Sequence, residues 1–181
     1  MPLMSIIGCE MFAQEVSQLL GKDGDIERLI VINEKKSDIV KQLQDLGAEY
    51  EELSPDMLPA GLKRNKGLCV IVDLQSVSLH IDRFRIKKET YEKIKFYGKV
   101  SNGVLLLYGV HNEAFADVLS DFERARFHLV ALKGDGSMMS ESGIDDCTTG
   151  RIDEGLLSPH VLAAYKESYR LLKKKLLDKK K

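Results

Sequence analysis

Apolar runs without polar–apolar alternation recur along this chain, and they constrain its fold more than any other feature. One begins at Met4, and the others span residues 29–32, 68–73, 104–109 and 127–132. Such runs are typical of strands in a parallel sheet covered on both faces, because both sides of each strand must then be apolar. The alternation of these runs with segments of helical spacing predicts an α/β fold. We expect an open, mostly parallel sheet of about five strands with helices on both faces.

The helices are predicted from apolar residues that recur on one helical face. The spacing indicates helices over residues 12–20, 37–46, 88–97 and 112–124. The segment 50–65 contains Pro55 and Pro59 and is predicted to be a loop with one helical turn at most.

The length and apolar content suit one compact domain, since the chain has 181 residues and 44% of them are hydrophobic. We expect the α/β domain to span residues 1–158 and a long, basic C-terminal helix to span 159–181. The predicted packing positions of that helix are Val161, Leu162, Tyr165, Tyr169, Leu171 and Leu172. Its basic end consists of Lys173, Lys174, Lys175, Lys179, Lys180 and Lys181. Such an end is either a solvated helix end or a site for an anionic partner.

Charge and composition argue against two classes of partner. The formal net charge of −1 gives no electrostatic footprint for nucleic acid. No apolar run is long enough to cross a bilayer, and the N-terminus lacks the pattern of a signal peptide. Three widely spaced cysteines do not form a disulfide framework. We therefore expect a cytoplasmic protein with reduced thiols that binds neither nucleic acid nor a membrane.

Polar side chains gather at or beyond the carboxyl ends of the predicted strands. In the order of the first, third, fourth and fifth strands, they are Cys9 and Glu10, Asp73 and His80, Tyr108 and His111, and Asp146 and Cys147. Open parallel sheets bind ligands at this edge. The sequence therefore predicts that these residues, although remote along the chain, converge on one site.

The donor set in this group suits zinc or another transition metal, which prefers thiolate and imidazole ligands. We predict that the metal ligands are Cys9, His80 and Cys147. Additional site residues are expected among Glu10, Tyr108, His111 and Asp146. Cys9 would also lie at the start of a helix, whose dipole favours a thiolate. The chain contains no C-x-x-C, H-E-x-x-H or G-x-S-x-G motif, so it does not resemble the common classes that carry them.

Each candidate ligand also has a structural interpretation. Cys9 is either a ligand or a small residue packed under a helix. His80 is either a ligand or a surface imidazole that caps a helix. Cys147 lies in a polar, glycine-containing stretch, which favours a site over mere packing. Cys69 lies in the middle of a predicted strand, and we expect it to be a buried structural cysteine.

Four short motifs resemble a family of uncharacterised proteins, the domain of unknown function 1638. They are Ile6-Ile7-Gly8-Cys9-Glu10-Met11-Phe12-Ala13-Gln14-Glu15, Leu79-His80, Leu106-Leu107-Tyr108-Gly109 and Asp146-Cys147, and they match in order over residues 4–150. The family tends to have a cysteine and glycines directly after Tyr-Gly, where this chain has Val110-His111-Asn112. If that cysteine is a ligand in the family, His111 replaces it here or this part of the site is lost.

The resemblance implies a role in methyl-group metabolism. Members of that family often accompany corrinoid-dependent methyltransferases that act on methylamines in methanogens and other anaerobes. One implied function is a metal- or thiolate-type site at the carboxyl edge of the sheet. The other is a non-catalytic accessory module that binds a corrinoid protein or a methyltransferase. In that case the partner, and not this chain, would carry the corrinoid. Enzyme and accessory protein both stay open at the level of sequence.

Overall fold

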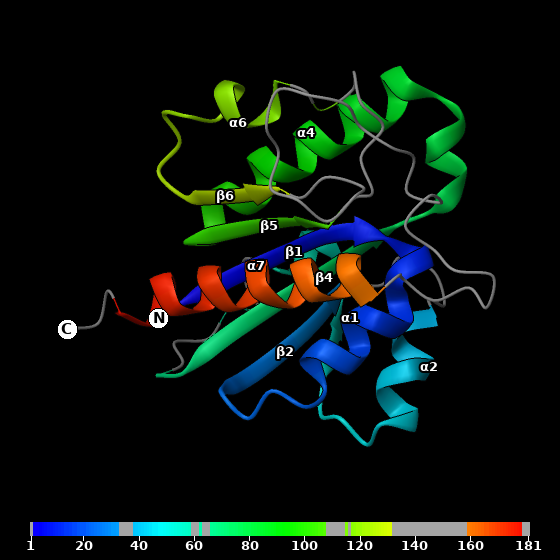
Figure 1. Cartoon of the computed structure of the whole chain (residues 1–181), viewed down its shortest axis with the longest axis vertical. Helices are drawn as coiled ribbons and strands as arrows, with labels where there is room; N and C mark the ends of the chain where they lie inside the picture. Colours follow the sequence, from blue (N-terminus) through cyan, green and yellow to red (C-terminus); the bar gives the residue numbers. More distant parts are fainter. Residues whose placement is uncertain are drawn as a thin grey trace.

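The computed structural model describes residues 2–32, 38–58, 62, 66–107, 115, 117–131 and 159–178, except for the side chains of residues 80, 81 and 159–161. Its centre is a sheet of six parallel strands in the order β3-β2-β4-β1-β5-β6 (Figure 1). The strands are β1 (Leu3–Cys9), β2 (Ile26–Ile32), β3 (Glu51–Leu53), β4 (Leu68–Gln75), β5 (Gly103–Leu107) and β6 (His128–Ala131). The predicted α/β fold with a parallel sheet is therefore confirmed.

The sixth strand, β3, lies where the sequence predicted a loop. Its three residues pair with Ile30, Val31 and Ile32 of β2 at the edge of the sheet. A strand of this length is too short to show a periodic pattern. An ion pair also holds it, because Arg28 Nη2 lies 2.6 Å from Glu51 Oε2. The expected helical turn follows as the 3-10 helix η2 (Pro55–Met57).

Helices cover both faces of the sheet. α1 (Ala13–Leu20), α2 (Asp38–Asp45) and α7 (Pro159–Asp178) lie on one face, and α4 (Arg83–Val100) and α6 (Val118–Asp121) lie on the other (Figure 1). The chain moves from β1 outward to β3 and then returns through β4 toward β6. Because crossovers between parallel strands are right-handed, this reversal of direction places the two sets of helices on opposite faces.

The central strand β1 pairs with β4 on one side and with β5 on the other. All seven of its residues are buried. Its apolar side chains join those of β2, β4 and β5 and of the covering helices in a single core. Burial on both faces explains why these strands read as continuous apolar runs in the sequence.

The helix α4 begins earlier than predicted because a carboxylate caps it. Asp82 Oδ1 accepts hydrogen bonds from the backbone N–H groups of Phe84 and Arg85, at 2.9 and 3.1 Å. The helix therefore starts at Arg83 rather than near residue 88. Of the helix predicted over residues 112–124, the structure describes the short α6, the buried side chain of Phe115 and the turn that follows α6.

The helix α7 packs on the sheet along its described length. Leu172 contacts β5 at Gly103, where a Cβ atom would lie 2.8 Å from Leu172 Cδ1, so the close approach depends on glycine. Tyr165, Tyr169 and Leu172 are buried, which confirms these predicted packing positions. Leu171 was predicted wrongly, since 46% of it is exposed. Leu176, one turn after Leu172, is buried instead.

Polar contacts anchor α7 to the turn that precedes β2. Lys173 Nζ lies 2.7 Å from Asp23 Oδ2 and 2.9 Å from Asp25 Oδ2. The Tyr169 hydroxyl donates a hydrogen bond to Asp23 Oδ2 at 2.7 Å. One lysine of the predicted basic end is therefore bound within the chain. Lys174 and Lys175 are exposed, and residues 179–181 lie outside the described residues.

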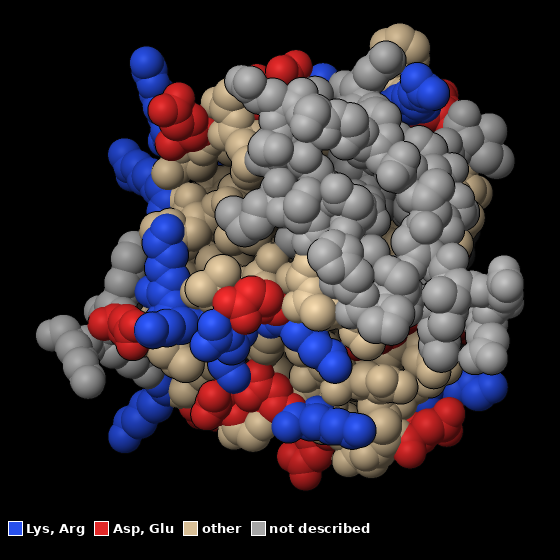
Figure 2. Space-filling model, viewed as in Figure 1, with Lys and Arg blue, Asp and Glu red and all other residues tan. Residues whose placement is uncertain are grey.

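Figure 2 shows basic and acidic side chains interspersed on the face that carries α7. Among the residues that the structure describes, no helix combines the length and the apolar character that crossing a membrane requires. The mixture of charges on this face follows partly from the pairing of α7 with acidic residues, both across to Asp23 and within the helix between Glu167 and Arg170.

The Asp23–Lys173 contact predicts a pH-dependent anchor for α7. Partial burial acts to raise the pKa of Asp23, but hydrogen bonds from Lys173 and Tyr169 outweigh it and hold the pKa below its ordinary value. A carboxylate with a lowered folded-state pKa stabilises the fold above its ordinary pKa, and this contribution is lost as the pH falls through the folded-state value.

We therefore expect Lys173→Met to lower the free energy of unfolding by about 1–2 kcal/mol near neutral pH, as measured by urea denaturation. The difference from the wild type should shrink as the pH falls below about 4. Lys174→Met, an exposed neighbour, is the control and should change little. A difference that persists unchanged in acid would assign the effect to the contact of the Lys173 ammonium group with the Tyr169 ring, 5.6 Å from its centroid, rather than to the Asp23 ion pair.

Candidate functional site

Cys9 lies at the carboxyl edge of the sheet, where the sequence placed it. It is the last residue of β1, and its Cα pairs with that of Gln75 at the end of β4. The chain leaves β1 toward the face of α1 and leaves β4 toward the face of α4 (Figure 1). Neighbouring strands whose connections diverge in this way leave a crevice at their ends, where α/β proteins bind ligands. The Cys9 side chain is completely buried there.

Glu10 joins the ends of these two strands. Its Oε1 accepts hydrogen bonds from the backbone N–H of Val77 at 2.9 Å and from the hydroxyl of Ser76 at 3.1 Å. Val77 begins the 3-10 helix η3 (Val77–Ile81), which contains His80. The carboxylate of Glu10 therefore holds the His80-bearing turn against the end of β1.

The meeting of the predicted metal ligands stays a prediction. The backbone of His80 lies in η3, but its side chain is not among those described. Cys147, Asp146, Tyr108 and His111 lie outside the described residues. The remaining described residues contain no group of three or more His, Cys, Asp or Glu side chains placed to hold a metal ion.

Cys69 is a buried strand cysteine, as predicted. It lies near the start of β4, and its side chain is completely buried. Burial raises the pKa of its thiol to about 11, although the nearby guanidinium of Arg28 acts in the opposite direction. The thiol therefore stays protonated at neutral pH, which makes it a poor nucleophile and a poor metal ligand.

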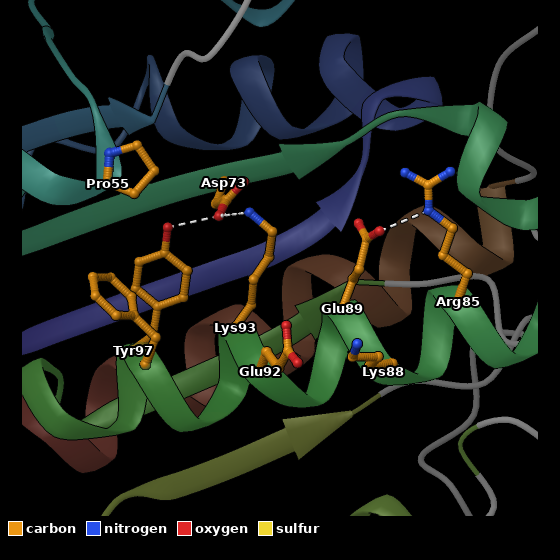
Figure 3. A pocket seen from close by; sticks show the side chains of 9 residues that line it. Pro55, Asp73, Arg85, Lys88, Glu89, Glu92, Lys93 and Tyr97 are labelled. Atoms are coloured by element: carbon orange, nitrogen blue, oxygen red, sulfur yellow. Dashed lines mark hydrogen bonds and ion pairs between the residues drawn. The ribbon is translucent and has the colours of Figure 1, made fainter.

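A cleft of about 580 Å³ opens between α4 and η2 (Figure 3). Its volume falls within the range of about 300–1,000 Å³ that is typical of small-molecule sites. The nine residues that line it are Pro55, Asp73, Arg85, Lys88, Glu89, Glu92, Lys93, Phe96 and Tyr97. Seven of the nine residues come from consecutive turns of α4, so this helix sets the character of the cleft.

A buried carboxylate forms the floor of the cleft. Asp73 lies inside β4 and is only 4% exposed. Its Oδ2 accepts a hydrogen bond from the hydroxyl of Tyr97 at 2.6 Å and pairs with the ammonium group of Lys93 (Figure 3). The cation and the phenol together compensate the charge that burial would otherwise make costly.

Gln75 extends this polar row toward the carboxyl edge. Its Oε1 accepts a hydrogen bond from the hydroxyl of Thr90 at 3.2 Å. Its Nε2 is buried and has no hydrogen-bond partner among the described residues. The sequence pattern places Asp73 near this edge but does not single out Gln75 or the α4 residues that face it, although a signal for the latter exists. Thr90, Lys93 and Tyr97 are polar positions on the same face of α4 as the buried Ile86 and Ile94.

The rim of the cleft carries both signs of charge. Arg85 Nε lies 2.8 Å from Glu89 Oε1, so these two side chains form a pair. Lys88 and Glu92 are exposed, and neither has an ionic partner among the residues that the structure describes. The cleft therefore offers one unpaired cation and one unpaired carboxylate on successive turns of α4.

Comparisons of the chain with protein-family models, with curated proteins and with solved structures find no match. The resemblance that rests on the short sequence motifs therefore stays a prediction.

The pairing of Lys93 with Asp73 can be tested by its contribution to stability. Lys93→Met leaves the buried carboxylate with the Tyr97 hydroxyl, and we expect it to lower the free energy of unfolding by about 2–4 kcal/mol. Lys95→Met, an exposed site on the same helix, should change it by less than about 0.5 kcal/mol.

The double variant Asp73→Asn/Lys93→Met removes the uncompensated charge. Its loss of stability in urea denaturation should therefore be smaller than the sum of the two single losses. Strictly additive losses would contradict a coupled pair.

Proposed function

We propose that this protein acts in methyl-group metabolism through a metal- or thiolate-type site at the carboxyl edge of the sheet, with Cys9 at its centre. The observation that supports this most directly is the Glu10 contact with Val77 and Ser76. It brings the turn that carries His80 to the end of the strand that carries Cys9. The methyl-metabolism context comes from the resemblance of the sequence motifs.

The proposed donors fit a transition metal by their chemistry. Cys9, His80 and Cys147 would hold the ion. Glu10 would fix the position of η3 rather than coordinate the metal, because its Oε1 already accepts a hydrogen bond from Val77. The remaining candidates are Tyr108, His111 and Asp146. A bound zinc ion would supply a deprotonated thiol or water at neutral pH. The complete burial of Cys9 favours a water-excluded site over a solvent-exposed reactive thiol.

Elemental analysis of the purified protein tests this proposal. We expect about one zinc or iron ion per chain, and its loss in Cys9→Ser and in Cys147→Ser. Cys69→Ala, at a buried thiol near the opposite end of the strands, is the matched control and should keep the metal. Wild-type protein that lacks metal and takes up neither zinc nor iron on reconstitution would refute the metal site.

An accessory role is the second candidate, and one exposed aromatic side chain favours it. Phe84, at the start of α4, is 88% exposed. It follows η3 at the same carboxyl edge as Cys9. Aromatic side chains are enriched at protein interfaces, where they bury large areas at low entropic cost. The proposed partner is a corrinoid protein or its methyltransferase, which would supply the corrinoid.

Binding to the purified partner proteins distinguishes the two roles. Under the accessory proposal, Phe84→Ser should abolish capture of the methyltransferase or corrinoid protein and leave the metal content unchanged. Leu171→Ser, at another exposed apolar residue, is the control. Deleting the C-terminal helix would not test docking, because it also removes the buried Leu172 and Leu176. Equal capture by wild type and Phe84→Ser would remove Phe84 as the docking residue.

A further inference from the structure

We propose that the cleft between α4 and η2 binds a small zwitterion, a free α-amino acid with an apolar side chain. This site is separate from the one proposed around Cys9, because its lining residues come from η2, the interior of β4 and the turns of α4. The inference therefore does not depend on a metal or on methyl-group metabolism.

Buried side chains at its base distinguish the cleft from a patch of surface charge. It is floored by Asp73 and Tyr97, whose exposed fractions are 4% and 1%. Pro55 and Phe96 supply apolar surface to the lining. A volume of about 580 Å³ is ample for a molecule the size of an amino acid.

Lys93 is placed to receive the carboxylate of such a ligand. An ammonium group has three donors, and the contact with Asp73 uses one of them. Its side chain is 25% exposed and lines the cleft, so the remaining donors can turn toward a ligand there. Because Asp73 holds the ammonium group in place, little side-chain freedom is lost on binding. Lys88, unpaired among the described residues, adds a second cation at the rim.

Glu92 is placed to receive the ammonium group of the ligand. It lies on the turn of α4 next to Lys93 and has no ionic partner in the described part of the chain. Glu89, the other carboxylate of the rim, is already engaged by Arg85. The unpaired charges that remain are thus one carboxylate and one ammonium, which is the complement of a zwitterion.

The balance of charge argues against a ligand of one sign. The lining contains three cations, Arg85, Lys88 and Lys93, and three carboxylates, Asp73, Glu89 and Glu92. A phosphate or a simple amine would be attracted by half of these groups and repelled by the other half. A molecule that carries both charges gains from both sets.

Isothermal titration calorimetry with three matched probes tests the proposal. L-Leucine is the zwitterion, 4-methylpentanoate lacks its ammonium group, and 3-methylbutylamine lacks its carboxylate. We expect L-leucine to bind, and each of the other two to bind at least about tenfold more weakly, since each loses one charged contact. Equal binding of all three would show that the ligand's charges are not recognised, and would overturn the proposal. Binding of none of them would overturn it as well.

Substitutions at exposed rim positions test which residues are responsible without risk to the fold. Lys88→Met and Glu92→Gln should each weaken L-leucine binding by roughly tenfold. Lys95→Met and Glu49→Gln, at exposed positions that do not line the cleft, should leave it unchanged. Cys9→Ser should also bind as the wild type does, which separates this result from that of the metal assay. Binding unaffected by both rim substitutions would place the ligand elsewhere and refute the assignment.

Discussion

The position of β1 between β4 and β5 is the constraint on which the rest of the molecule depends. Both pairings join residues that are remote in the sequence, such as Leu3 with Cys69 and Met4 with Gly103. From β1 the chain moves to β2 on one side, and from β4 it crosses β1 to reach β5 on the other, so right-handed crossovers put the two connections on opposite faces of the sheet. That divergence places Cys9 at the point where the strand order reverses and sends α4 across the face where the cleft lies.

The two proposed sites flank the same strand. Gln75, the last residue of β4, lies opposite Cys9, and Asp73, two positions earlier, floors the cleft. Both polar side chains are buried beneath α4, with hydrogen bonds to Tyr97 and Thr90. Polar groups in such a place cost free energy unless they are satisfied, so α4 must supply complementary side chains on the face that packs against the sheet.

The sequence predicts the layers of this fold well, because apolar runs and helical spacing record burial directly. It predicts Cys9 at the carboxyl edge and Cys69 in the core for the same reason. It does not predict β3, because a strand of three residues is too short to show a periodic pattern. It does not predict the burial of Leu176 either, because that depends on how far α7 follows the sheet. It also misses the cleft. The pairing of Lys93 with Asp73 joins residues whose proximity depends on how α4 crosses β4, and local patterns carry no such information.

The late arrival of α7 has a consequence for biogenesis. During translation, β1 and β5 leave the ribosome well before the helix that covers them on one face. Until Leu172 packs against Gly103, the face of the sheet that α7 covers exposes apolar side chains of the kind that chaperones recognise. Since Lys173 then engages Asp23, which lies 150 residues earlier, this contact can form only after both segments have emerged.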